Sequence, residues 1–156
     1  MKELNLTVLR TEPGNKDFLS LTNLLDDVLS RNDGEDHPFF AQFNKANDLD
    51  KAVLIYSDNI PVSCGAIKKY SDTTAEIKRM YVKPEYRGKG IAKKTLHELE
   101  YWASELNYTE CILETGKDLV AAVGLYKESG YEVISNYGQY KGIDKSICFR
   151  KILRMV

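Results

Sequence analysis

Two glycines near the middle of the chain constrain its fold more than any other feature. The segment 85–92 reads Glu-Tyr-Arg-Gly-Lys-Gly-Ile-Ala, and it separates a strand-like run, 75–83, from a helix-like run that begins near Gly88. Glycines two positions apart let the backbone turn tightly and approach a ligand closely. The first N–H groups of a helix lack partners within it, and the helix dipole favours an anion there. The pattern therefore predicts an anion-binding turn.

The charges in this turn indicate which anion it binds. Arg87 and Lys89 add full positive charge, which makes a pyrophosphate the natural ligand. The segment lacks the Gly-x-x-x-x-Gly-Lys-Ser/Thr spacing of a nucleoside triphosphate loop. It also lacks the third glycine of a dinucleotide fingerprint, because Ala92 follows Gly90 by two residues. A surface turn with solvated charges remains the alternative.

The residues before the turn help to identify the ligand. The preceding strand-like run ends in Lys-Arg-Met-Tyr-Val-Lys-Pro at 78–84. The segment 76–92 resembles the central motif of the GNAT acyltransferase superfamily, and the resemblance continues more loosely over 62–131. It implies acetyl-CoA as the co-substrate. No metal is expected, because the sequence has no cluster of histidines and cysteines. The main chain of the strand and the phosphate loop would bind acetyl-CoA, through Met80, Tyr81, Val82, Arg87, Gly88, Lys89, Gly90, Ile91 and Ala92.

Two further positions match catalytic residues of the resembled family. Acyl transfer to an amine needs a group that accepts the ammonium proton and one that protonates the leaving thiolate. Glu76 stands where some GNAT enzymes carry a base glutamate, although an ion pair with Lys78 or Arg79 would also explain it. Tyr126 matches the tyrosine near the coenzyme sulfur, with packing in a helix as its alternative. Leu119 stands where the family commonly has asparagine.

The resemblance also places an acceptor pocket. His37 and Phe40 lie in the region of the early helices that build this pocket in GNAT proteins, and Tyr137 lies in a late loop that often covers it. A loop histidine without chemistry and a packed tyrosine remain the alternatives. Nothing in these segments identifies the acceptor amine or the preferred acyl chain.

Composition limits the partners. The chain of 156 residues has a net charge of −1, which argues against binding to nucleic acid or a membrane surface. We also expect no transmembrane helix, because no apolar run approaches the roughly 18 residues required. Cys64, Cys111 and Cys148 lie in apolar segments and form no paired motif, which predicts reduced thiols in a cytoplasmic protein. A homodimer through a sheet edge or the C-terminal strands stays open.

Hydrophobic periodicity predicts the order of elements. Strands are expected at 4–10, 52–57, 62–70, 74–82, 109–114, 133–135 and 147–153, and helices after Asn15, from Gly88 and over 118–129. Segment 36–46 is either a second helix or a mobile loop, and Gly65 marks a bulge or a close backbone contact. We predict a single N-acetyltransferase domain over 1–156 of the α/β (α+β) class. Its central sheet is mixed and mostly antiparallel, with helices on both faces and, by the resemblance, splayed parallel middle strands.

The leading functional hypothesis is an enzyme that transfers an acetyl group from acetyl-CoA to a primary amine of a small molecule. Direct attack in a ternary complex is expected, because no well-placed cysteine or serine suggests an acyl-enzyme. The alternatives are a protein or peptide amine as acceptor, a non-catalytic acyl-CoA sensor, and an enzyme acting on a nucleotide diphosphate.

Overall fold

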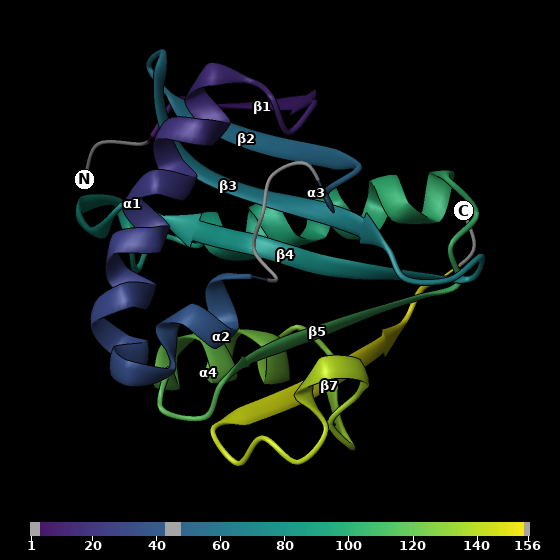
Figure 1. Ribbon diagram of the computed structural model, residues 1–156. Helices are drawn as coiled ribbons and strands as arrows, with labels where there is room; N and C mark the ends of the chain where they lie inside the picture. The colour runs from purple at the N-terminus through teal and green to yellow at the C-terminus, as the bar shows by residue number, and fades with distance from the viewer. Residues whose placement is uncertain (1–3, 43–47, 155–156) are drawn as a thin grey trace. The chain divides into compact units, whose positions relative to one another are not determined.

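The computed structural model describes residues 4–42 and 48–154 (Figure 1). They form, in chain order, β1 (Leu6–Thr11), α1 (Lys16–Asp33), the 3-10 turn η1 (Gly34–Asp36), α2 (His37–Ala41), β2 (Lys51–Ser57), β3 (Ile60–Lys69), β4 (Thr74–Val82), the 3-10 turn η3 (Pro84–Tyr86), α3 (Ile91–Glu105), β5 (Glu110–Gly116), α4 (Val120–Glu128), β6 (Glu132–Ile134), the 3-10 turn η4 (Gly138–Tyr140) and β7 (Ser146–Ile152). Two compact units contain these elements. The first unit comprises the described residues of 1–68 and 78–99, and the second those of 69–77 and 100–154.

The strands form one mixed sheet in the order β1-β2-β3-β4-β5-β7-β6. The pairs β1/β2, β2/β3, β5/β7 and β6/β7 are antiparallel, whereas β4 and β5 are parallel. The parallel ladder is short, since it runs only from the pair Thr74–Glu110 to the pair Glu76–Ile112. The predicted mixed, mostly antiparallel sheet with parallel middle strands is confirmed.

Local signals in the sequence fix the ends of the elements in the first unit. The Oδ1 of Asn15 accepts hydrogen bonds from the amides of Asp17 (2.8 Å) and Phe18 (3.2 Å), so Asn15 caps α1 as predicted. Asp58 and Asn59 have φ of 48° and 72°, which lets β2 turn directly back into β3. The hairpin therefore follows from two residue types that tolerate the left-handed conformation.

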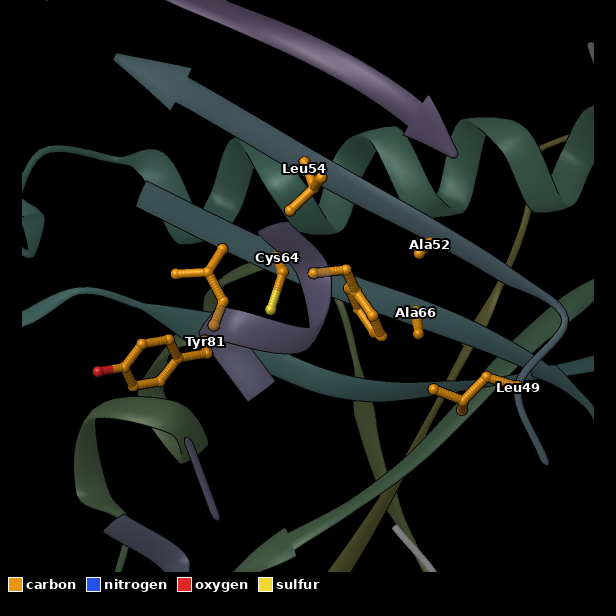
Figure 2. Packing of buried hydrophobic residues seen from close by; sticks show 8 residues of the cluster. Leu49, Ala52, Leu54, Cys64, Ala66 and Tyr81 are labelled. Carbon is orange, nitrogen blue, oxygen red and sulfur yellow. The ribbon is translucent and has the colours of Figure 1, made fainter. Parts of the chain in front are cut away.

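Strand alternation in the first unit places α1 and α3 on opposite faces of the sheet. One face contributes Ala52 and Leu54 of β2, Cys64 and Ala66 of β3, and Tyr81 of β4, all gathered in one cluster (Figure 2). Phe18 and Leu21 of α1 complete this cluster. The other face contributes Ile55 and Val62, which pack with Ile91 of α3. Helices therefore cover both faces in this unit, as the period-2 pattern of its strands requires.

Gly65 lies where the backbone of β3 passes close to α3. A Cβ at this position would lie 2.6 Å from Leu99 Cδ1 and 2.8 Å from Met80 Sδ, so a larger residue would have to displace the ends of these two side chains. Of the two expectations for this glycine, the close contact is confirmed. The irregular register occurs elsewhere, between Ile55 and Tyr56 of β2.

In the second unit, a buried network lies beside α4. The ring of Tyr126 on α4 contacts Phe149 of β7 and Tyr131, with centroids 5.9 and 5.8 Å away. The hydroxyl of Tyr131 and the Nζ of Lys151 each donate to the carboxylate of Glu100, at 2.8 Å. These polar groups form hydrogen bonds with one another, because a buried polar group without a hydrogen bond costs free energy.

The structure corrects several element boundaries. The helix expected from Gly88 begins at Ile91, and the one expected from residue 118 begins at Val120. The helix α3 ends at Glu105, and Leu106, the next residue, is 41 % exposed. Segment 36–46 contains the short helix α2, while residues 43–46 lie outside the described part of the chain. No helix among the described residues has the length and apolar character that crossing a bilayer requires.

Candidate functional site

The predicted phosphate loop of the first unit is an open turn that leads into α3. Gly88 and Gly90 adopt φ of +76° and +79°, in the left-handed region that glycine occupies at little cost. A Cβ built at either position would meet no atom within 4 Å, so space is free beside the backbone. Because the 15-residue helix begins at Ile91, its unpaired N–H groups open next to that space. The loop therefore fits a bound phosphate group.

Arg87 joins this loop to β4. Its Nε donates a 2.8 Å hydrogen bond to the carbonyl of Val82, and its guanidinium lies over the ring of Tyr81, 5.6 Å from the centroid. Arg87 thus anchors the loop in addition to carrying charge, which the sequence did not predict. Lys89 is exposed, so its ammonium is available to an anion.

The predicted pantetheine-binding segment is packed through its side chains. Tyr81 and Val82 are each 8 % exposed, and Met80 is half-buried. In the helix, Ile91 is buried while Ala92 is half-buried. These positions can therefore serve a ligand mainly through their main chain.

Arg79, named above as one alternative partner of Glu76, bonds with α1. Its Nη2 donates to the carbonyl of Thr22 (2.9 Å) and to Oδ1 of Asp26 (2.7 Å). Its backbone adopts φ +60° within β4, which is costly for a residue with a Cβ. The ion-pair alternative is therefore wrong for Arg79.

The second unit brings together Glu76 and Tyr137, two of the predicted site residues. Glu76 on β4 is 4 % exposed, and its Oε2 accepts a 2.5 Å hydrogen bond from the hydroxyl of Tyr137. The ring of Tyr137 packs edge-to-face on Tyr70 and on Tyr140, with centroids 5.4 and 5.6 Å away. Burial, followed by the charge of Glu76, raises the pKa of Tyr137 far above that of a free phenol. The phenol therefore stays protonated and donates to Glu76.

Tyr126 is almost fully buried on α4. Its ring contacts the rings of Tyr131 and Phe149, which fix its orientation. Burial, followed by the charge of Glu114, raises the pKa of Tyr126. Leu119, at the N-cap of the same helix, makes no side-chain capping bond. The helix thus lacks the hydrogen bond that an asparagine could supply there.

The predicted acceptor residues of the first unit lie on α2. His37 begins this helix, with its Nδ1 3.4 Å from Oδ2 of Asp33, and Phe40 packs edge-to-face on Phe39, with centroids 5.2 Å apart. In the second unit, the sequence did not reveal that Tyr70 packs against Tyr137. The only signal was the density of tyrosines around Gly138.

The three cysteines are free and buried, as predicted. Burial raises the pKa of Cys64 and of Cys111 to about 12. It also raises the pKa of Cys148 to about 11. Since the thiolate is the nucleophile, none of these thiols is activated.

Known proteins resemble this chain in sequence and in fold. Residues 18–131 match the acetyltransferase (GNAT) family. An IAA acetyltransferase of Azospirillum brasilense is 29% identical over 146 residues, which cover 87% of this chain and 90% of that protein. A crystal structure from Klebsiella pneumoniae, described as an acyl-CoA N-acyltransferase, superposes with a TM-score of 0.80 at 27% identity and covers 96% of this chain and 98% of that one.

A GNAT family acetyltransferase from Elizabethkingia anophelis, solved with acetyl-CoA bound, gives a TM-score of 0.72 at 18% identity, over 96% of this chain and 99% of that one. This likeness concerns the fold. The family match, by contrast, extends over the phosphate loop, Glu76 and Tyr126. The chain therefore belongs to the GNAT family of acetyltransferases.

Proposed function

We propose that the chain transfers an acetyl group from acetyl-CoA to a primary amine of a small molecule, by direct attack within a ternary complex. The observation that carries this proposal is the open loop of Gly88 and Gly90 at the start of α3. The acetyl-CoA bound in the Elizabethkingia structure supports the acyl donor, and the name of the Azospirillum relative, an IAA acetyltransferase, supports transfer of an acetyl group to a small molecule.

Each part of the first unit has a binding role in this proposal. The N–H groups of residues 88–92 bind the pyrophosphate, assisted by Lys89 and Arg87. The main chain of Met80, Tyr81 and Val82 pairs with the amide-bearing arm of the coenzyme, as a strand edge pairs with an added strand. The amide of Val82 donates to the thioester carbonyl oxygen, where negative charge develops. Bound acetyl-CoA supplies the acyl group as a reactive thioester.

The second unit supplies the proton transfers. Glu76 acts as general base toward the acceptor amine, because only a neutral amine is nucleophilic. Tyr126 donates a proton to the departing thiolate, since its raised pKa keeps the phenol protonated until then. An acyl-enzyme is disfavoured, because a thiol with a pKa of 11 or more is a thiolate in only about one molecule in 10⁴ near pH 7.

The remaining assignments follow the same proposal. His37, Phe40 and Tyr137 contact the acceptor. Residues 1–156 form one domain, which is supported by β4 and α3 each contributing residues to both units. Buried free thiols support a cytoplasmic location, and the net charge of −1 supports a small molecule over nucleic acid or a membrane as partner. A homodimer is compatible with this function.

Two assays test the proposal. Calorimetry should detect binding of CoA and acetyl-CoA. Release of free thiol should then accompany acetylation within a panel of ethanolamine, benzylamine, tyramine, putrescine and lysine. Glu76→Gln should bind acetyl-CoA normally while kcat falls by roughly 10²–10⁴.

The same panel, extended with lysine-containing peptides, also separates the alternatives. Binding without turnover on any amine or peptide would indicate a sensor, and turnover on peptides alone would reject the small-molecule acceptor. Unchanged turnover of Glu76→Gln would reject the assignment of the base.

A further inference from the structure

Glu76 is poorly placed to meet an acceptor on its own. The residue is 4 % exposed, and its Oε2 already accepts the hydroxyl proton of Tyr137 at 2.5 Å. Tyr137, by contrast, is only half-buried. The hydroxyl of Tyr137 is therefore the group that contacts this carboxylate oxygen, and a proton can reach Oε2 through it.

We propose that Tyr137 is a catalytic residue that receives the proton of the acceptor amine and passes its own proton to Glu76. This inference rests on the proposed function and specifies how Glu76 acts as its base. A phenol hydroxyl can fill this place because its oxygen accepts one hydrogen bond while its proton donates another.

The proton transfer balances over the three groups. As the acceptor nitrogen loses a proton, an O–H bond forms at the hydroxyl oxygen of Tyr137. The original O–H bond of Tyr137 breaks, and its proton binds Oε2 of Glu76. The amine becomes neutral, Glu76 becomes protonated and Tyr137 ends as the neutral phenol with which it began. No oxidant or further reactant is needed.

The surroundings of Tyr137 hold it in the position that this transfer requires. The ring lies edge-to-face between Tyr70 and Tyr140, at interplanar angles of 80° and 89°, which limits its rotation. Immediately after it, Gly138 turns the chain at φ +52° into η4, whose Tyr140 is 4 % exposed. Because burial beside Glu76 raises the pKa of Tyr137, a tyrosinate does not accumulate and the hydroxyl stays a donor.

The test compares Tyr137→Phe with Tyr70→Phe in single turnovers of the acetyl-CoA-loaded protein on the best amine of the panel. Both variants keep a ring of the same stack and lose one hydroxyl, but only the hydroxyl of Tyr137 bonds to Glu76. We expect Tyr137→Phe to react roughly 10²–10⁴ times more slowly with unchanged acetyl-CoA affinity, and Tyr70→Phe to react at the wild-type rate. In mixtures of H₂O and D₂O, the wild-type rate should depend on the deuterium fraction along a curve, because two protons move together.

Three results would overturn the inference. A Tyr137→Phe rate within a few-fold of wild type would show that Glu76 meets the amine directly. A slow Tyr137→Phe combined with a linear wild-type dependence on deuterium would mean that Tyr137 only positions Glu76. A wild-type protein inactive on every amine would remove the proposed function and this inference with it. In the first two cases, activity of the wild-type protein on at least one amine shows that the proposed function stands and that only this inference has failed.

Discussion

Replacement of Gly88 by alanine separates the binding role of the loop from its effect on stability. The residue has φ +76°, and a Cβ there would meet nothing within 4 Å, so the added methyl causes no clash within the protein. Gly142 has the same φ of +76° and equally open surroundings, but it lies outside the phosphate loop. The variants Gly88→Ala and Gly142→Ala therefore make a matched pair.

The expected effect on stability is small and similar for both variants. An L-residue in the left-handed region costs roughly 1–2 kcal/mol. The lower entropy of the unfolded chain with alanine offsets about 0.4–1 kcal/mol of this cost. A net loss of about 1 kcal/mol shifts Tm by roughly 2–4 °C in a domain of this size. Thermal unfolding followed by circular dichroism should show this shift in both proteins.

Binding should distinguish the pair. In Gly88→Ala the methyl enters the space that we assign to the pyrophosphate, and it weakens at least one charge-assisted hydrogen bond worth about 1.5–3 kcal/mol. Calorimetric affinity for CoA should therefore fall about 10-fold to 150-fold. Gly142→Ala should bind CoA as the wild type does. The assignment of this loop would be refuted if both variants bound CoA with the same affinity, whether that affinity equalled the wild-type value or was reduced.

Two further predictions follow from the buried groups. A thiol reagent at pH 8 should react with Cys64, Cys111 and Cys148 only after the protein is unfolded in guanidinium. Burial raises the pKa of these thiols to about 11 or 12, so little thiolate is present in the folded protein. Fast reaction of any one thiol in the folded protein would contradict this. Lys151→Met should lower the free energy of unfolding in guanidinium by about 1–3 kcal/mol, since the largely buried Glu100 loses one of its two donors. Lys69→Met, which removes an exposed pair with Asp72, should change it by less than about 0.5 kcal/mol and is the control.

Elements with local determinants were predictable from the sequence. Asn15 caps α1 through its own side chain, and Asp58 with Asn59 forms a turn in the left-handed conformation that both residue types tolerate. The strand expected over 74–82 has the observed bounds. The start of α3 was placed too early because Gly88 and Gly90 adopt left-handed angles, which a helix excludes. A glycine-rich helix start therefore indicates a loop before the first turn.

Contacts between distant residues were not predictable. Arg79 bonds with Asp26, which lies 53 positions earlier, and its φ of +60° follows no local preference of arginine. The hydrogen bond between Glu76 and Tyr137 joins residues 61 positions apart. The resemblance to GNAT proteins identified both residues of this pair as candidates, but only the folded chain places one hydroxyl against one carboxylate.

This difference explains why the sequence indicates the acyl donor more clearly than the acceptor. Recognition of a pyrophosphate depends on main-chain N–H groups within six consecutive residues, so the pattern from Arg87 to Ala92 carries most of the information. In the proposed function, recognition of an amine depends on side chains such as Glu76 and Tyr137, which meet only through folding. Two chains with the same loop can therefore share a donor and differ in acceptor when their late tyrosines differ. Exchange of Tyr137 and its neighbours should alter amine preference while affinity for CoA stays constant.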